Sequence, residues 1–207
     1  MNCTFKFLAS LNGLVCRIMY RVDRKKEDPL PVEGPVLLVS NHSSYSDPLV
    51  LMASVHRPIH FLMAREIFEL PHLQWAFHAM GCIPVSRNRV EIGAIRAVLR
   101  LLENGEVVGL FPEGGIEAYR EESGYVGMAY LALKTGTSVV PVSILWDGPR
   151  PKRIIQSLLV RGRAQVKFGL PIPVVKNSHP TRQALEQMTA TIMNTIQELK
   201  HSQFHKE

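Results

Sequence analysis

The sequence has 207 residues, of which 46% are hydrophobic and 20% are charged, and its formal net charge is +6. This composition indicates one ordinary globular domain, and no run of 18 apolar residues is present that would predict a membrane-spanning helix. The positive charge suits an anionic partner. No zinc-finger spacing occurs and the aromatic residues are not interleaved with the basic ones, so nucleic acid is not an expected partner.

The first predicted element is an amphipathic helix over residues 2–22, followed by basic residues up to position 26. The apolar residues that fall close to one face of this helix are Phe5, Leu8, Leu11, Val15, Ile18 and Met19. Because an amphipathic helix beside cations suits a bilayer surface, residues 1–27 are predicted to lie at a membrane interface. The alternative is a helix packed on its own domain. We expect a peripheral or monotopic protein on the cytoplasmic face of a membrane.

Residues 28–207 are predicted to form one α/β domain. Apolar runs with β-branched residues predict strands over 36–39, 59–63, 81–87, 107–111, 139–145 and 164–168. Helical patterns occupy 48–55, 71–78, 92–102 and 128–134, and Thr181 can cap a last helix. Since strands and helices alternate, we predict a central mixed, mostly parallel sheet flanked by helices.

A polar turn, Asn41 to Asp47, follows the first predicted strand directly. Open α/β sheets hold their ligands at the carboxyl ends of the strands. A histidine with a carboxylate five residues on, His42 and Asp47, is a possible general base with its orienting partner. Pro48 biases Asp47 away from the helical region, so the pair can meet only if the backbone turns between them. Ser44, in the same turn, is a further candidate contact for substrate.

A second turn follows the strand predicted over 107–111. It contains Glu113 between a proline and two glycines, Gly114 and Gly115. Glycine after a strand lets a ligand approach the backbone and frees amide N–H groups for an oxyanion or a phosphate. Glu113 could position a hydroxyl-bearing substrate or support the backbone beside it. The alternative is a simple turn.

Five blocks in order resemble the glycerophospholipid acyltransferases of the 1-acylglycerol-3-phosphate acyltransferase type. The residues Asn41-His42-Ser43-Ser44-Tyr45-Ser46-Asp47 match the family's first motif. The later blocks are Gly81-Cys82-Ile83-Pro84-Val85-Ser86-Arg87, Phe111-Pro112-Glu113-Gly114, Val139-Val140-Pro141-Val142 and Phe168-Gly169-Leu170-Pro171-Ile172. The resemblance covers roughly residues 33 to 173.

The resemblance implies direct transfer of a fatty acyl group from a thioester to the hydroxyl of a lysophospholipid. His42 would take the hydroxyl proton while Asp47 holds the imidazole ring. Arg87 would bind the acceptor phosphate, and amides near Gly114 and Gly115 would stabilise the oxyanion. The donor would be acyl-CoA or an acyl carrier protein, the product phosphatidic acid, and no cofactor or metal is expected.

The third block departs from the family pattern, because Gly115-Ile116-Glu117 stands where threonine, arginine and serine are usual. This loses a phosphate-binding cation, so another lysophospholipid or an amino-acid lipid is an alternative acceptor.

A non-catalytic lipid-binding module is the main alternative from another class. A serine hydrolase lacks its Gly-x-Ser-x-Gly motif here. A metal hydrolase would gather His42, Asp47, His56, His60 and Glu113, but Pro58 prevents one helix from presenting both later histidines. Three cysteines, an odd number without framework spacing, favour a reducing compartment.

Overall fold

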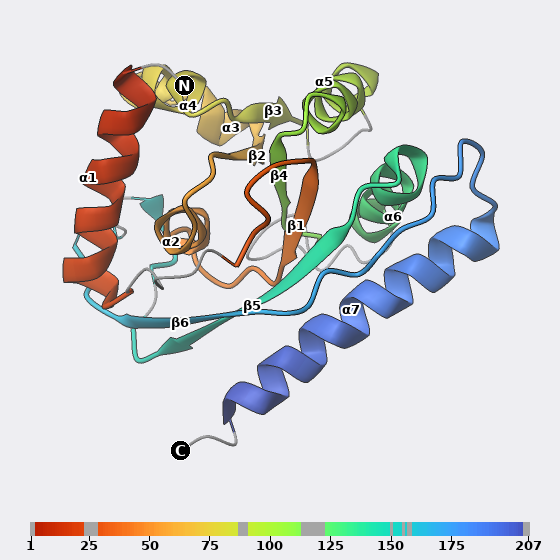
Figure 1. Ribbon diagram of the computed structural model, residues 1–207. Coiled ribbons are helices and arrows are strands. Elements are labelled where there is room, and N and C mark those ends of the chain that lie inside the picture. Colours follow the sequence, from red (N-terminus) through yellow and green to blue (C-terminus); the bar gives the residue numbers. More distant parts are fainter. Residues whose placement is uncertain are drawn as a thin grey trace.

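A six-stranded sheet forms the centre of the computed structural model, which describes residues 3–22, 29–86, 91–112, 123–149, 151–154, 156 and 159–204. The strands are β1 (Val36–Ser40), β2 (Ile59–Ala64), β3 (Ile83–Val85), β4 (Val107–Leu110), β5 (Val139–Asp147) and β6 (Arg163–Phe168). Their order across the sheet is β3-β2-β4-β1-β5-β6 (Figure 1). All neighbours pair in parallel except β5 and β6, which are antiparallel. The predicted mixed, mostly parallel sheet is confirmed.

The two central strands, β1 and β4, are buried along their whole length. Strands covered on both faces read as continuous apolar runs, which is why the sequence alone located them. β6 pairs with β5 at one end of the strand order. Since β1, β2, β3, β4 and β5 are parallel, their carboxyl ends lie at one edge of the sheet.

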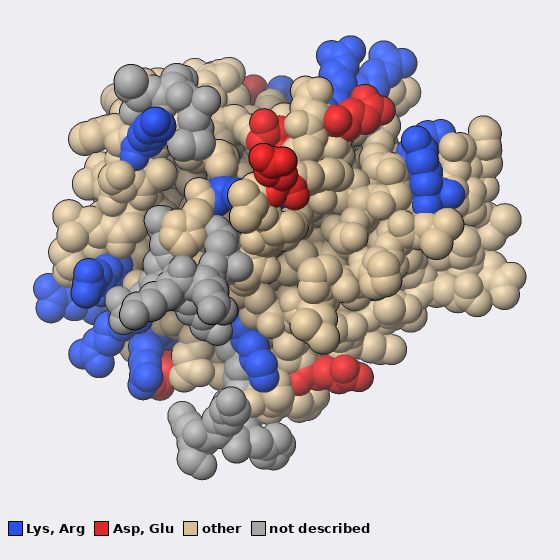
Figure 2. Space-filling model, viewed as in Figure 1, with Lys and Arg blue, Asp and Glu red and all other residues tan. Residues whose placement is uncertain are grey.

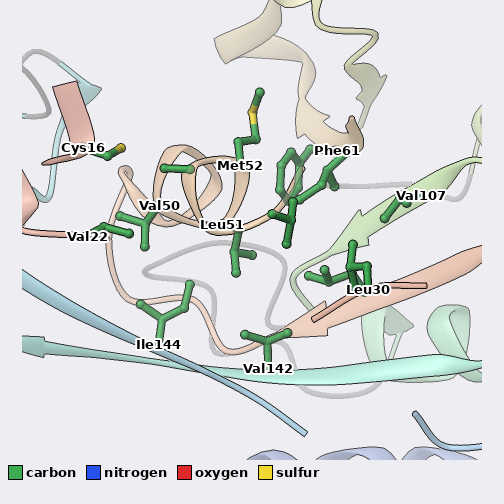
Figure 3. Packing of buried hydrophobic residues seen from close by; sticks show 14 of the residues in the cluster. Cys16, Val22, Leu30, Val50, Leu51, Met52, Phe61, Val107, Val142 and Ile144 are labelled. Carbon is green, nitrogen blue, oxygen red and sulfur yellow. The ribbon is translucent and has the colours of Figure 1, made fainter. Parts of the chain in front are cut away.

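Helices cover both faces of the sheet (Figure 1). They are α1 (Cys3–Tyr20), α2 (Asp47–Ser54), α3 (Arg65–Phe68), α4 (Gln74–Ala79), α5 (Ile92–Glu103), α6 (Ser123–Thr135) and α7 (Arg182–Phe204). One core cluster joins α1 and α2 to the sheet (Figure 3), and the other joins α5, α6 and α7 to it. The last helix begins as predicted, because Thr181 Oγ1 accepts a hydrogen bond from the amide of Ala184 at 3.2 Å. Its predicted inner face contributes Ile192 and Ile196 to the core.

Two local predictions were wrong. The short helix α3 was missed, because four residues are too few to show a helical period. Asp47 begins α2 although a proline follows it. The pre-proline restriction is a steric bias, and here the hydrogen bonds of the Asp47 amide and carboxylate outweigh it.

Helix α1 has two apolar faces, whereas one was predicted. The side that packs on the protein carries Phe5, Asn12, Cys16 and Tyr20. The opposite side exposes a stripe of apolar side chains, Phe7, Leu11, Leu14 and Ile18, each at least 47% exposed. The predicted face was therefore wrong, since Leu11 and Ile18 point outward and Phe5 points inward. No helix in the described parts of the chain is both long and apolar enough to span a membrane.

Candidate active site

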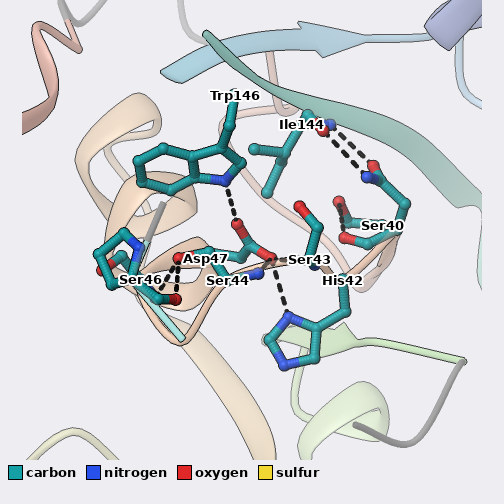
Figure 4. A network of polar contacts seen from close by, with 10 residues as sticks. Ser40, His42, Ser43, Ser44, Ser46, Asp47, Ile144 and Trp146 are labelled. Carbon is teal, nitrogen blue, oxygen red and sulfur yellow. Dashed lines mark hydrogen bonds and ion pairs between the residues drawn. The ribbon is translucent and has the colours of Figure 1, made fainter. Parts of the chain in front are cut away.

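The turn between β1 and α2 brings His42 and Asp47 together at the carboxyl edge of the sheet (Figure 4). His42 Nδ1 lies 2.9 Å from Asp47 Oδ2. Residues 41–46 form the turn, and the amide of Asp47 donates to the carbonyl of Ser44 at 3.0 Å. The backbone therefore reverses between the two side chains, as their five-residue spacing required.

The Asp47 carboxylate is fully buried and accepts four hydrogen bonds. Its Oδ2 accepts from the amides of Ser43 and Ser44 at 2.7 and 2.8 Å and from the ring of His42. Its Oδ1 accepts from Trp146 Nε1 at 2.7 Å. A buried charge needs such partners to offset its lost hydration. The carboxylate is therefore fixed in place before any substrate arrives.

The hydrogen bond to Asp47 decides which ring nitrogen of His42 carries a proton. An ionised carboxylate only accepts, so neutral His42 has its hydrogen on Nδ1 and its lone pair on Nε2. Nε2 is then the atom that can take a proton, and Asp47 would stabilise the resulting imidazolium. The side chain of His42 is 14% exposed, so the ring is mostly enclosed but reaches the surface.

An aromatic stack supports the other side of the imidazole ring. The His42 and Phe111 ring centroids lie 4.3 Å apart, and Phe111 stacks in turn on Phe61 at 5.6 Å. Gly109 makes this possible, because a Cβ there would lie 2.4 Å from the ring of Phe61. The third predicted block therefore contributes a wall to the site through its first residue, Phe111.

Three further contacts hold the turn to the rest of the protein. The side-chain amide of Asn41 makes two hydrogen bonds with the backbone of Ile144, at 2.8 and 2.9 Å, and so extends the pairing of β1 with β5. The Tyr20 and Ser46 hydroxyls lie 2.7 Å apart, which ties the turn to α1. Ser44 Oγ donates to the carbonyl of Pro151 at 2.8 Å.

Ser44 is fully buried, and its hydroxyl both donates to Pro151 and accepts from the amide of Ser46. The structure therefore gives Ser44 a part in positioning the turn, and its buried hydroxyl does not face a substrate. The same burial removes Ser44 and Ser46 as nucleophiles of a serine hydrolase.

No metal site is found among the described residues, in which no group of three or more His, Cys, Asp or Glu side chains could hold an ion. His60 contacts the carbonyl of Gly81 at 3.0 Å and Glu106 at 3.9 Å. It lies near the start of β2, away from the carboxyl edge that carries His42. The described histidines are thus not gathered as a metal hydrolase would need.

The other predicted site residues, Arg87, Glu113, Gly114 and Gly115, lie outside the described residues. The described chain leads to them from β3, which ends at Val85, and from β4, which ends at Leu110. Both strands end at the same edge of the sheet as β1.

Two residues that sequence reasoning missed lie at or near this edge. Trp146 is 99 positions from Asp47 and had no local signal. Arg65 directly follows β2 and makes an ion pair with Glu91 at 2.7 Å. Its position at the end of a predicted strand could have revealed it, as it did for His42.

Replacing Trp146 with phenylalanine should lower kcat by on the order of tenfold, since a hydrogen bond to a charged group contributes about 1.5–3 kcal/mol. Phenylalanine keeps a ring against Tyr20, with which Trp146 makes an edge-to-face contact at 5.1 Å, but removes the donor to Asp47. The matched control is Trp75→Phe, because Trp75 is 58% exposed. Steady-state rates of both variants test this. Equal rates in the two would contradict the role of Trp146.

The chain is similar in sequence to proteins of known activity. The chloroplastic 1-acyl-sn-glycerol-3-phosphate acyltransferase of Arabidopsis thaliana is 30% identical over 161 residues, which are 74% of this chain and 44% of that protein. The enzyme of that name from Bacillus subtilis is 23% identical over 95% of this chain and 97% of its own length. The chain spans about half the length of the plant and algal relatives it matches.

Among solved structures, the fold is similar to that of the 1-acyl-sn-glycerophosphate acyltransferase PlsC from Thermotoga maritima. The TM-score is 0.66 at 20% identity, with 94% of this chain and 80% of that chain covered. Residues 21–145, which include the His42 turn and β1 to β4, match the family model described as Acyltransferase. The chain belongs to the Acyltransferase family.

Proposed function

We propose that the protein transfers a fatty acyl group from a thioester to the free hydroxyl of 1-acylglycerol-3-phosphate, giving phosphatidic acid. The observation that carries the proposal is the 2.9 Å contact between His42 Nδ1 and the carboxylate of Asp47, which accepts four hydrogen bonds in all. Relatives that carry this activity in their names are similar in sequence. The Bacillus subtilis enzyme matches along nearly the full chain.

The proposed reaction needs no covalent intermediate on the protein. The acceptor hydroxyl gives its proton to His42 Nε2 as its oxygen attacks the thioester carbonyl. The carbon–sulfur bond then breaks, and the imidazolium returns the proton to the leaving thiolate. Asp47 stabilises the imidazolium throughout, because the buried carboxylate cannot turn away from Nδ1.

The acceptor's phosphate would be bound by cations at the carboxyl edge of the sheet. Arg87 keeps the role that the family resemblance gives it. Arg65 follows β2 at this edge, and its guanidinium can make paired hydrogen bonds to a phosphate. A second cation would offset the arginine that the third block lacks.

The donor is proposed to be acyl-CoA or an acyl carrier protein, and the acceptor to be reached from a membrane. The exposed apolar stripe on α1 supports attachment at a bilayer interface. We place the protein peripherally or monotopically on the cytoplasmic face, where such thioesters are made.

The test is an assay of the purified protein with palmitoyl-CoA and a panel of acceptors: 1-acylglycerol-3-phosphate, lysophosphatidylcholine, lysophosphatidylethanolamine and an amino-acid lipid. We expect thiol release only with an acceptor, fastest with 1-acylglycerol-3-phosphate, and phosphatidic acid by mass spectrometry. Thiol release without acceptor would indicate a hydrolase, and none with any acceptor would indicate a lipid-binding module.

The protein's own buried thiols should disturb a thiol-detecting dye little. Burial raises the pKa of Cys16 and Cys82 to about 12. Both thiols therefore stay protonated at the pH of the assay, and the thiol form reacts slowly.

A further inference from the structure

Three arginines surround a cavity of about 290 Å³ where the end of α1 meets the paired ends of β5 and β6. They are Arg21, Arg161 and Arg163, and the acidic side chain of Asp147 also lines the cavity. Figure 2 shows basic side chains gathered at the lower left of the molecule, the region of these three ends in Figure 1. The proposed acyl transfer uses none of these residues.

The guanidinium groups are not neutralised by any residue that the structure describes. Within the described residues, Arg21, Arg161 and Arg163 make no ion pair or side-chain hydrogen bond, and Asp147 pairs with none of them. Arginine stays charged at any physiological pH, so the cavity carries an excess of two positive charges. Like charges at close range repel, and a bound anion would relieve this repulsion.

The backbone holds the three arginines in place around the cavity. Arg21 has a left-handed φ of 53° just beyond α1, and the Val22 amide beside it donates to the carbonyl of Cys16 at 3.3 Å. The amide of Gly162 donates to the carbonyl of Met19 at 3.0 Å.

Gly162 allows this approach, since a Cβ there would lie 2.5 Å from the carbonyl oxygen of Pro149. Arg163 begins β6 opposite Asp147 of β5. Main-chain contacts therefore hold the site together, and the arginine side chains that line it can bind a ligand.

The cavity is continuous with the apolar stripe of α1. Ile18 belongs to the stripe and also lines the cavity. Phosphate oxygens are the anions that guanidinium groups bind best in pairs. The volume is just below the roughly 300–1,000 Å³ of sites that enclose a whole small molecule, which suits a head group whose chains remain in a bilayer.

We propose that the cavity between Arg21, Arg161 and Arg163 binds the phosphate head group of an anionic membrane lipid while the α1 stripe inserts among the chains beside it. This would fix the orientation of the protein on the bilayer. Vesicle binding needs no substrate, so this proposal and the proposed reaction can fail separately.

The experiment measures binding of the full chain to vesicles of phosphatidylcholine with and without 30% phosphatidylglycerol. One variant changes Arg21, Arg161 and Arg163 to glutamine. The matched control changes Arg96, Arg100 and Lys176 to glutamine, since these cations are also exposed and lie away from the cavity. Each variant removes three positive charges from a chain of formal net charge +6. Thermal unfolding of both variants verifies that they are folded.

A cation near an anionic leaflet contributes about fivefold to binding. We expect the cavity variant to bind the anionic vesicles at least about tenfold more weakly than the wild type, and the control variant to stay within about threefold. An equal loss in both variants, or none in the cavity variant, would overturn the proposal. Displacement of the wild type from vesicles by millimolar coenzyme A or inorganic phosphate would also overturn it, because the site would then serve a soluble anion.

Discussion

Alanine at position 42 should lower the rate of acyl transfer by at least about 10²–10⁴-fold, the usual contribution of a general base. His42 is the group whose Nε2 can take the acceptor's proton. Neither described neighbour of the ring can replace it, because Phe111 is apolar and the oxygens of Asp47 are already hydrogen-bonded. The measurement is kcat with 1-acylglycerol-3-phosphate and palmitoyl-CoA.

The variant should remain folded. Asp47 keeps its hydrogen bonds from Ser43, Ser44 and Trp146, so the carboxylate is still compensated when the ring is absent. A loss of about 1 kcal/mol would lower Tm by roughly 2–4 °C in a chain of this size. The matched control is His179→Ala, which removes an exposed imidazole from a loop. Wild-type turnover by His42→Ala would contradict the proposed base.

Asparagine at position 47 should reduce kcat by up to about 10⁴-fold, the scale expected when the carboxylate partner of a catalytic histidine becomes an amide. With its oxygen in the place of Oδ2, the amide still accepts from Nδ1, but a neutral amide stabilises the imidazolium far less than the carboxylate does. The Michaelis constants of donor and acceptor should change much less than kcat, because Asp47 is fully buried. An unchanged kcat would contradict the role of Asp47.

The same substitution should destabilise the fold by about 1–3 kcal/mol, the cost of an unsatisfied buried polar group. All four partners of Asp47 donate, and an amide replaces one of the two accepting oxygens with an NH₂ group that also donates. With its oxygen toward the amides of Ser43 and Ser44, its NH₂ faces Trp146 Nε1.

Combining Asp47→Asn with Trp146→Phe should recover part of the lost stability, because it removes one of the two opposed donors. Denaturant unfolding of the two single variants and the double variant forms a double-mutant cycle. Additive losses would show that the two donors do not meet.

Sequence reasoning located the elements whose signal is local. The buried strands β1 and β4 are continuous apolar runs, and the start of α7 follows from Thr181. The buried face of α1 was wrong for a physical reason. A helix that is apolar on two sides has no single period to read, and only the packing of Cys16 and Tyr20 decides which side turns inward.

The site residues also divide into those with a local signal in the sequence and those without one. His42 and Asp47 were found because both lie in one turn after one strand. Trp146 was not, because its contact with Asp47 joins β5 to the turn across 99 residues. Ser44 was predicted to contact substrate because it lies close to His42 in the sequence. Its hydroxyl instead donates to the carbonyl of Pro151, which no local pattern predicts.

Helix α1 contributes to the core and to the turn of the site, apart from the membrane role proposed for it. Cys16 and Tyr20 are completely buried, the side chain of Asn12 donates to the carbonyl of Leu49 at 2.9 Å, and Tyr20 reaches Ser46 in the turn between His42 and Asp47. Trimming this helix to obtain a more soluble protein would therefore open the core and loosen the Asp47 turn. Exchanging the four outward apolar side chains of α1 for polar ones would instead remove the proposed bilayer contact and leave the core intact.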